Sequence, residues 1–418
     1  MSELNYLEKL LDGTEVEWKA LGDVTSVLRG KRLTKNLLSA EEKFPVFHGG
    51  LEPLGYYNKS NRPANTVMII NVGASAGTVG YSTVDFWSSD GCFCLEHNEL
   101  LNNRFLYFAL IGYQSLLKSK VRVAGIPTLD AIVVNKLLIP IPCPENPEKS
   151  LAIQSEIVRI LDKFSALTAE LTAELTAELN MRKKQYNYYR DQLLSFDEEQ
   201  EKPVYLEKLL DGVEVEWRTL GEIAVIYDGT HKTPKYTASG VPFVSVQNIK
   251  NLYGTNKYIS PEDFKTYKNK PRKHDLFMTR IGDVGTCAIV EDDRPLAYYV
   301  TLALIRINQQ IAVPGFIRYL IESRFGKAEL YKRTLIHAVP MKINLGEIGK
   351  VAVPIPCPDN PEKSLAIQSE IVRILDKFDT LTNSITEGLP REIELRQKQY
   401  EYYRDLLFSF PKPETASN

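Results

Sequence analysis

Glycines and histidines are the residues of this sequence whose types could support a nucleotide or metal site. Gly73, Gly77 and Gly80 faintly resemble a phosphate cradle, but no helix with a Lys-Ser or Lys-Thr pair follows, so we expect hairpin turns there. The segment GEIGK at 346–350 has the wrong spacing for a nucleotide-binding loop. The histidines are scattered without the spacing of metal ligands and lie at His48, His97, His231, His274 and His337.

Signatures of other catalytic chemistry are also missing. Residues 358–363, PDNPEK, superficially resemble a nuclease cluster, but the acid and the lysine are adjacent. The Asp/Asn-Pro-Pro-aromatic signature of aminomethyltransferases and the HExxH zinc pair are absent. We therefore expect a chain that is not an enzyme by itself and that binds no metal or cofactor of its own.

The composition is that of an ordinary globular protein. A chain of 418 residues with 44% apolar content is long enough for two or three domains. Its apolar runs are far shorter than the roughly 18 residues that span a bilayer, and the N-terminal MSELNYLEKL lacks a signal-peptide pattern. Five cysteines without a CxxC pair argue against a disulfide framework or a zinc site and favour a reducing compartment, so we expect a cytoplasmic protein.

Several segments occur twice in the chain, and this is the strongest signal in the sequence. Residues 140–164 return at 354–378, and across these 25 positions only Glu145 and Asp359 differ. Core packing alone would tolerate drift, yet polar residues of solvent-exposed type are repeated too. The other repeated segments are 6–24 with 205–223, and 181–196 with 395–410.

The repeated polar residues indicate two near-identical surfaces. We interpret these surfaces as docking sites for two copies of one partner around a pseudo-twofold axis. The alternative is a recent duplication that has not diverged, although the segments between the repeats, 25–139 and 224–353, share little sequence. The repeated residues include Lys149, Ser155, Glu156 and Arg159, which recur at positions 363, 369, 370 and 373.

Charge separates the variable segments from the repeated frame. Segment 25–139 holds 12 basic and 8 acidic residues, a net charge of +4, and segment 224–353 holds 19 and 11, a net charge of +8. The remainder carries a net charge of −14, so the whole chain has −2. Two basic blocks on an acidic frame are typical of two DNA-reading modules on a protein-binding scaffold.

The repeated segments predict helices. Asn146-Pro147 and Asn360-Pro361 fit an N-cap followed by proline at the first helical position. An apolar seam then continues at four-residue spacing, and we predict that the two helices pack antiparallel as a long coiled-coil-like pair. Pro390 must start or kink a helical piece in the second copy. The seam residues are Leu167, Leu171, Leu175, Leu179, Leu381, Ile385, Leu389 and Ile393.

The tract LTAELTAELTAEL at 167–179 lies inside the first helix. Each four-residue unit adds about 6 Å to a helix, which corresponds to one or two base-pair steps of about 3.4 Å. We interpret the tract as a spacer, and a helix lengthened by replication slippage without a measuring role is the alternative. The aromatic helix ends KQYNYYRD and KQYEYYRD could stack on bases, but we favour packing of these ends onto the domains.

The variable blocks predict mixed α/β domains. Strand, glycine turn and strand are expected at 65–82 and 275–292, and equivalent strands at 44–50 and 241–249. Helical pieces are expected around 103–121 and 315–333.

The whole chain resembles the DNA-specificity subunit of bacterial type I restriction-modification systems, because it has duplicated helical segments with two unrelated domains between them. The central TAEL array is similar to that of the IC class, and residues 229–249 resemble the opening of a target-recognition domain. Many members carry Pro-Pro-Leu before a Glu-Gln at the helix start, whereas here the helix starts after IPCPENP with SLAIQ.

The resemblance implies a division of labour. Each target-recognition domain would contact one half of a bipartite, asymmetric site in double-stranded DNA, and the helical pair would set the gap. Two modification subunits, which carry S-adenosylmethionine and methylate adenine, would dock on the repeated surfaces. Two restriction subunits that use ATP and Mg²⁺ would join them in the full enzyme, and this chain would be a DNA-associated bacterial protein.

The expected fold is mixed α+β, with two α/β target-recognition domains separated by two long antiparallel helices in a pseudo-twofold, circular arrangement. The expected segments are a first domain at 1–145, a central helix at 146–196, a second domain at 197–359, a C-terminal helix at 360–410 and a tail at 411–418.

Base reading would use Arg or Lys on guanine and Asn or Gln on adenine, while other basic groups hold phosphates. The candidates in the first block are Arg29, Lys31, Arg32, Lys35, His48, Asn71 and Arg122. The candidates in the second block are His231, Lys232, Lys235, Tyr236, Gln247, Asn248, Lys273, Arg280 and His337. A different class of function stays open: a non-enzymatic coiled-coil scaffold that joins two nucleic-acid- or protein-binding domains.

Overall fold

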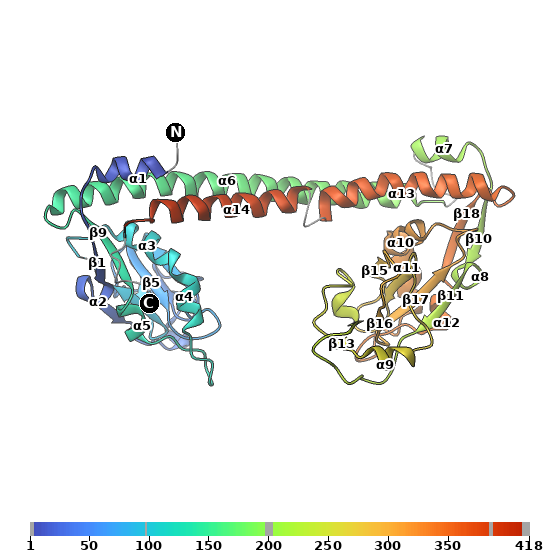
Figure 1. Ribbon diagram of the computed structural model, residues 1–418, viewed down its shortest axis with the longest axis horizontal. Coiled ribbons are helices and arrows are strands. Elements are labelled where there is room, and N and C mark those ends of the chain that lie inside the picture. The colour runs from blue at the N-terminus through green and yellow to red at the C-terminus, as the bar shows by residue number, and fades with distance from the viewer. Residues whose placement is uncertain (1–3, 97, 197–203, 384–387, 412–418) are drawn as a thin grey trace. The chain divides into compact units, whose positions relative to one another are not determined.

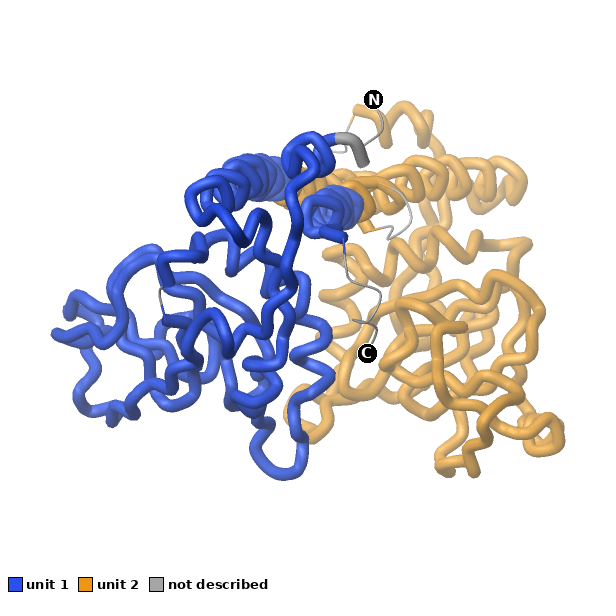
Figure 2. The backbone as a smooth tube through the Cα atoms, turned by 60° about the vertical axis from the view of Figure 1, so that its left-hand side comes forward, with its two compact units in different colours: residues 1–174, 393–418 blue, residues 175–392 orange. Residues whose placement is uncertain are grey.

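The computed structural model describes residues 4–96, 98–196, 204–383 and 388–411. His97, Ile385 and the end of the tail, all named above, lie outside these residues. Contacts divide the chain into unit 1, residues 1–174 with 393–418, and unit 2, residues 175–392 (Figure 2). No helix among the described residues is both long enough and apolar enough to cross a bilayer.

This grouping differs from the five segments read along the chain. Each unit combines one α/β domain with parts of both helical segments, because the helices lie beside each other within each unit. The mixed α+β class expected from the sequence is confirmed.

Unit 1 contains an α/β domain with three small sheets (Figure 1). Its strands are β1 (Val16–Ala20), β2 (Val27–Arg29), β3 (Phe44–Phe47), β4 (Gly55–Tyr57), β5 (Thr66–Ile70), β6 (Val79–Ser82), β7 (Trp87–Ser88), β8 (Cys92–Leu95) and β9 (Leu138–Pro142). Its short helices are α1 (Leu4–Leu11), α2 (Leu21–Val24), η1 (Lys35–Leu37), α3 (Asn103–Gly112), α4 (Gln114–Ser119) and α5 (Ala131–Asn135). The sheet orders are β2-β8-β5-β6, β4-β3-β7 and β1-β9.

Unit 2 repeats this topology with different residues. Its strands are β10 (Val215–Thr219), β11 (Ala224–Asp228), β12 (Val241–Val244), β13 (Tyr258–Ile259), β14 (Leu276–Thr279), β15 (Cys287–Ile289), β16 (Ala297–Tyr298), β17 (Leu302–Ile307) and β18 (Ala352–Pro356). Its short helices are α7 (Val204–Leu210), α8 (Leu220–Ile223), η2 (Val246–Asn248), α9 (Pro261–Lys265), α10 (Pro314–Glu322), α11 (Arg324–Arg333) and α12 (Leu345–Ile348). The orders β11-β17-β14-β15, β13-β12-β16 and β10-β18 match those of unit 1 strand for strand.

Glycine turns close the central hairpin in each domain, as the sequence predicts. Gly73 and Gly77 adopt φ of 93° and 86° between β5 and β6, a conformation that costs glycine least. A Cβ on Gly77 would lie 2.8 Å from the backbone nitrogen of Lys118. Gly282 and Gly285 form the same turn between β14 and β15, with φ of 84° and 95°. These four glycines therefore serve chain reversal, whereas Gly80, which was also expected in a turn, lies within β6.

The long helices begin where the sequence predicts. Helix α6 (Pro147–Leu193) follows Asn146, whose Oδ1 accepts a hydrogen bond from the backbone nitrogen of Lys149 at 3.0 Å. Helix α13 (Pro361–Asn383) follows Asn360, which accepts the equivalent bond from Lys363 at 3.0 Å. Both asparagines therefore act as N-caps.

The second copy is divided into two helices. Helix α14 (Gly388–Leu407) begins at Gly388, with φ of 75°, and has Pro390 in its first turn. Proline lacks a backbone donor and is tolerated in a first turn, so the predicted start of a helical piece is confirmed. Helix α6 runs unbroken through its whole length, including the TAEL tract.

Antiparallel packing of the helices includes one aromatic contact that occurs twice. In unit 1 the ring of Phe164 in α6 stacks on Tyr403 in α14 with centroids 5.2 Å apart. In unit 2 the ring of Phe378 in α13 stacks on Tyr189 in α6 at 5.4 Å. The two pairs consist of the same repeat positions with the roles of the copies exchanged. This reciprocity is what pseudo-twofold symmetry between the repeats requires.

The predicted apolar seam is only partly buried. Leu167 and the equivalent Leu381 are 50% and 54% exposed, so neither belongs to a packed seam. A four-residue step turns a helix by about 40° beyond a full circle, which carries the seam away from the neighbouring helix. The remaining described members are half-buried: Leu171, Leu175, Leu179, Leu389 and Ile393.

Each long helix is fastened to its domain through main-chain atoms. Buried Gln154 in α6 accepts a hydrogen bond from the backbone nitrogen of Asn102 at 2.8 Å and donates one to the carbonyl of Leu100 at 3.0 Å. Its repeat, Gln368 in α13, accepts from the backbone nitrogen of Val313 at 2.9 Å and donates to the carbonyl of Ile311 at 3.1 Å. Because the domain partners are main-chain atoms, the same glutamine fits two domains of different sequence.

Candidate nucleic-acid interface

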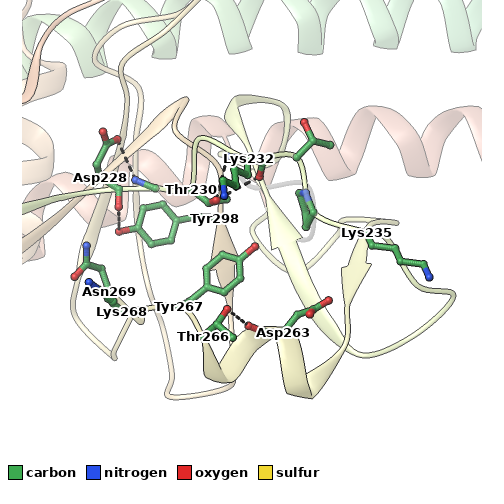
Figure 3. Close-up of a pocket in the computed structure, with 13 residues that line it drawn as sticks. Asp228, Thr230, Lys232, Lys235, Asp263, Thr266, Tyr267, Lys268, Asn269 and Tyr298 are labelled. Atoms are coloured by element: carbon green, nitrogen blue, oxygen red, sulfur yellow. Dashed lines mark hydrogen bonds between the residues drawn. The ribbon is translucent and has the colours of Figure 1, made fainter.

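A hollow lies on the domain of unit 2, beside the end of β11 (Figure 3). Its cavity volume is about 570 Å³, and its walls come from residues 228–230, 232–235 and 266–269 together with Asp263 and Tyr298. Lys232, Lys235 and Lys268 give the wall three cations against the two carboxylates of Asp228 and Asp263. We call this hollow the lysine groove.

At Gly229, one of the residues that line the groove, the chain passes close to Tyr299, which directly follows β16. A Cβ at this position would lie 2.5 Å from the carbonyl of Tyr299, which only glycine avoids. The next residue, Thr230, donates its backbone N–H to the carbonyl of Tyr298 at 3.1 Å. The segment is thereby fixed and presents Lys232 and Lys235 on its exposed side.

The opposite wall follows helix α9. Ser260 caps this helix by accepting a hydrogen bond from the backbone nitrogen of Asp263 at 3.0 Å, and Pro261 occupies its first position. Thr266 ends it by donating its hydroxyl to the carbonyl of Asp263 at 2.6 Å. Tyr267, Lys268 and Asn269 then line the groove. Burial raises the pKa of Tyr267, so its hydroxyl stays protonated at neutral pH.

A chain of charged groups leads from the interior to the groove. Nη1 of buried Arg280 donates to Oδ1 of Asp228 at 2.8 Å, and Oδ2 of Asp228 lies 2.9 Å from Nε2 of His231. Arg280 also donates to the carbonyls of Val300 and Ile343 at 3.0 and 3.3 Å. His231 is exposed, so Arg280 and Asp228 orient it toward solvent.

Two of the predicted DNA-contacting residues, Arg280 and Asn71, are buried. Arg280 was expected to contact DNA, but only 7% of the residue is exposed, and its Nε and Nη1 donate to internal acceptors. It therefore positions Asp228, and a contact of Arg280 with DNA stays a prediction. Asn71, its counterpart in unit 1, is also buried: it is 2% exposed, its backbone pairs with Gly91 and Leu129, and its Oδ1 has no hydrogen-bond partner among the described residues.

The equivalent position in unit 1 carries a cationic side chain in place of the carboxylate. Arg29 stands where unit 2 has Asp228, and its Nε donates to the carbonyl of Asp90 at 3.2 Å. Nδ1 of His48 lies 3.4 Å from Oδ1 of the same aspartate. Arg29 is exposed and His48 is half-buried, so the structure brings these two candidates together at Asp90.

The other candidates in the first block are exposed but do not form one cluster. Lys31 is anchored through its backbone, because its nitrogen donates to Ser88 and its carbonyl accepts from the indole of Trp87. Arg122 pairs with Asp130 at 2.9 Å on a projecting loop. Arg32 lies on the exposed segment that leads into η1, and exposed Lys35 is the first residue of η1.

The remaining candidates in the second block are dispersed. Tyr236 packs edge-on against Phe243 and is 41% exposed. Asn248 is a local cap, because its Oδ1 accepts the backbone N–H of Ser245 at 3.1 Å, whereas Gln247 beside it is exposed. Lys273 and His337 are also exposed, the latter on a loop after α11.

Sequence reasoning missed Asp228, Lys268 and Asn269. A signal for the two groove residues was present, because residues 265–273, KTYKNKPRK, hold five cations in nine positions. Asp228 had no such signal, since its role depends on a buried arginine 52 residues away. Among the residues that the structure describes, no three His, Cys, Asp or Glu side chains gather as a metal site.

Comparison with known proteins gives consistent matches over the whole chain. The family model described as "Type I restriction modification DNA specificity domain" matches residues 14–181 and 212–395. The chain is 40% identical to the EcoR124I/EcoR124II type I restriction enzyme specificity subunit of Escherichia coli, with all of both chains covered. It is 32% identical to a putative type I specificity subunit of Haemophilus influenzae, covering 97% of this chain and 98% of that one.

A solved structure shows that the fold is shared. A chain from a study of complex assembly and conformational transition in the type I R-M system aligns with a TM-score of 0.58 and 18% identity, over 94% of this chain and 97% of that chain.

Proposed function

The chain belongs to the family of type I restriction-modification DNA specificity subunits, and we propose that its two variable domains each bind one half of a bipartite, asymmetric DNA sequence. One observation carries the proposal. Two domains with the same strand order and different surface residues are held by one repeated frame, through main-chain atoms that do not depend on the domain's sequence. Such a construction lets two different base readers work in one molecule.

The second domain would hold DNA at the lysine groove. Three lysines at its wall suit phosphates, while the tyrosine and asparagine beside them can donate to sugars or base edges. His231, oriented by Asp228, is the best-positioned base reader of this domain. In the first domain, Arg29 and His48, which meet at Asp90, would be the base readers.

The repeated surfaces would dock two modification subunits. In unit 1, Tyr6 of α1 donates to Glu156 of α6 at 3.0 Å, and Glu156 pairs with Arg159 at 2.6 Å. In unit 2, α7 and α13 reproduce this cluster, with Tyr205 donating to Glu370 at 3.1 Å. Two matching surfaces favour two copies of one partner. Restriction subunits would join through these partners, which would supply S-adenosylmethionine, ATP and Mg²⁺, and this chain would be non-catalytic.

The TAEL tract would set the gap between the two half-sites, as in the IC class. Helix α6 is continuous through residues 168–179, and each four-residue unit contributes about 6 Å of helix. Lengthening the tract therefore changes the spacer by one or two base-pair steps of about 3.4 Å.

Mapping of methylated adenines tests this function. The full chain is co-expressed with its cognate modification subunit in cells that lack other adenine methylation, and methylated positions are mapped across the genome. Variants that delete residues 172–175, or insert a further TAEL after Leu175, are mapped in parallel.

We expect one bipartite motif whose half-sites keep their sequence in both variants while the gap shortens or lengthens by one or two base pairs. An unchanged gap would rule out the spacer role. Absence of any bipartite motif would overturn the proposed function itself.

A further inference from the structure

Each domain carries a projecting loop that is anchored at the same place in the fold. Residues 122–128 connect α4 and α5, and the loop projects beyond both helices (Figure 1). Residues 335–342 connect α11 and α12. The carbonyl of Pro127 accepts from the backbone nitrogen of Gly73 at 2.9 Å, and the carbonyl of Met341 accepts from Gly282 at 2.9 Å. Both loops are therefore held at the central hairpin. We call them the hairpin-anchored loops.

Large aliphatic side chains on these loops are exposed to solvent. Val123 and Ile126 are 80% and 70% exposed, and Val339 and Ile336 are 100% and 40% exposed. The two loop sequences, RVAGIPT and LIHAVPMK, differ, so the shared feature is the exposed apolar surface and not a shared motif. Clustered exposed aliphatic residues of this kind indicate a surface that is covered when a partner binds.

Charge around the loops favours a polyanion as that partner. Lys118 and Lys120 are exposed at the foot of the first loop, and Lys342 is exposed at the foot of the second. Arg122 stands at the start of the first loop and pairs with Asp130. An apolar tip above a cationic base fits a nucleic-acid groove, where apolar side chains enter between base steps and cations hold the flanking phosphates.

The loops are continuous with the candidate interface. The carbonyl of Arg280 accepts from the backbone nitrogen of Ile343 at 2.9 Å, and the same arginine holds Asp228 at the lysine groove. In unit 1 the carbonyl of Asn71 accepts from Leu129 at 2.9 Å. One residue thus ties the end of each loop to the strand end beside the proposed base readers.

We propose that the hairpin-anchored loops insert Val123 with Ile126, and Ile336 with Val339, against base steps of the bound duplex as apolar wedges. Each wedge would unstack a step within or beside its own half-site. Because the loops are fixed to the hairpins, their position is set before DNA arrives, and sequence preference at that step would come from how easily it unstacks. This inference rests on the proposed function.

Fluorescence of 2-aminopurine tests the wedge. The full chain, assembled with its cognate modification subunit, is bound to a duplex carrying the mapped site, with 2-aminopurine placed at one step at a time across each half. The methylated adenines are left out of the scan, because their extrusion by the modification subunit would itself raise the signal. The variants are Val123→Ser with Ile126→Ser, and Ile336→Ser with Val339→Ser. Val84→Ser and Val225→Ser are controls on exposed valines outside the loops.

The wild-type complex should show one bright step for each half-site. Each loop variant should lose the bright step of its own half only and bind the site roughly tenfold more weakly, while the controls change neither quantity. Site-specific binding without any bright step, or bright steps unchanged in the loop variants, would overturn the wedge and leave the proposed function intact. Loss of the modification subunit from the purified variant would also overturn it, because the loop would then be a protein contact. Absence of site-specific binding by the wild type would count against the function itself.

Discussion

Unit 1 and unit 2 have the same strand topology, but at one equivalent position they carry side chains of opposite charge. Where β2 ends, unit 1 has an exposed Arg29, and the position equivalent to Arg280 holds a buried, neutral Asn71; where β11 ends, unit 2 has Asp228 held by a buried Arg280. The strand orders are identical. The charge of the side chain at this position can therefore differ between the two domains, because the sheets stabilise the fold and these side chains do not determine it.

The repeated frame shows the reverse behaviour. Gln154 and Gln368 are buried in equivalent helices and make the same three hydrogen bonds, two to main-chain atoms of the domain and one to a serine of their own helix. A contact with the main chain survives almost any change of the domain's side chains. The frame is therefore constant because its partners are the atoms that sequence does not alter.

The largest expected effect comes from removing this fastening. Gln154→Met or Gln368→Met keeps the side-chain volume but leaves buried main-chain groups unpaired, which should lower the free energy of unfolding by about 3 kcal/mol in either unit. Chemical denaturation combined with hydrogen exchange of each domain measures the loss. Gln397→Met, at an exposed position, is the control. If the free energy of unfolding fell by different amounts in the two units, the two glutamines would not be equivalent.

The next effect separates the two variable domains. Asp228→Ala leaves the buried guanidinium of Arg280 without its carboxylate, and we expect a loss of about 2 kcal/mol in the free energy of unfolding. Arg29→Ala, at the corresponding exposed position, should change stability by less than about 0.5 kcal/mol and act on the DNA affinity of the first half-site. Thermal denaturation and binding to each half-site check both outcomes. A destabilised Arg29 variant would contradict the comparison.

A smaller effect concerns the lysine groove. Replacing Lys232, Lys235 and Lys268 by Gln removes cations without burying anything, so stability should be unchanged. Affinity for the second half-site should fall whatever its base sequence, and the slope of log K against log salt should decrease by about one for each phosphate that a lysine no longer neutralises. Salt titrations of DNA binding measure this slope, with Lys327→Gln and Lys350→Gln as controls.

Only the second half-site should weaken in the groove variant. If the sequence preference of both half-sites were lost together, the two domains would not be independent readers.

The smallest effect is a dependence on acid. The hydrogen bond with Arg159 lowers the pKa of Glu156 to about 2, and Arg373 does the same for Glu370. These pKa values are depressed in the folded protein. The contribution of each ionised carboxylate to stability is therefore complete at a pH above the ordinary glutamate pKa of 4.5 and is lost as the pH falls toward about 2. Helices α1 and α7 should loosen together in this range, as followed by hydrogen exchange. In Glu156→Gln, α1 should no longer respond while α7 still does; a response of only one helix in the wild type would contradict the symmetry.

Much of the fold could be predicted from the sequence, because local patterns decide it. The N-caps at Asn146 and Asn360, the glycine turns and the start of a helical piece at Pro390 follow from residue types at fixed spacing. The apolar seam was predicted less well, since Leu167 and Leu381 are half-exposed. Their spacing predicts that the apolar residues share one side of the helix, but it does not indicate on which side a neighbouring helix lies.

The candidate site was predicted at the level of segments and not of single side chains. Basic composition pointed to segments 25–139 and 224–353, yet it could not separate buried Arg280 and Asn71 from exposed Lys232 and Arg29. Burial depends on the sheets that cover a residue, and those strands are distant in the sequence.

The sequence by itself determined the duplication, the charged blocks, the helical frame and the family, because each of these is a local or repeated pattern. Tertiary structure alone decided that Arg280, Asp228 and His231 form one chain of contacts, that one glutamine fastens two different domains, and that two unlike loops share an anchor. The reason is physical: hydrogen bonds and burial act over a few ångströms in space, and only folding brings residues that lie far apart in the chain within that distance.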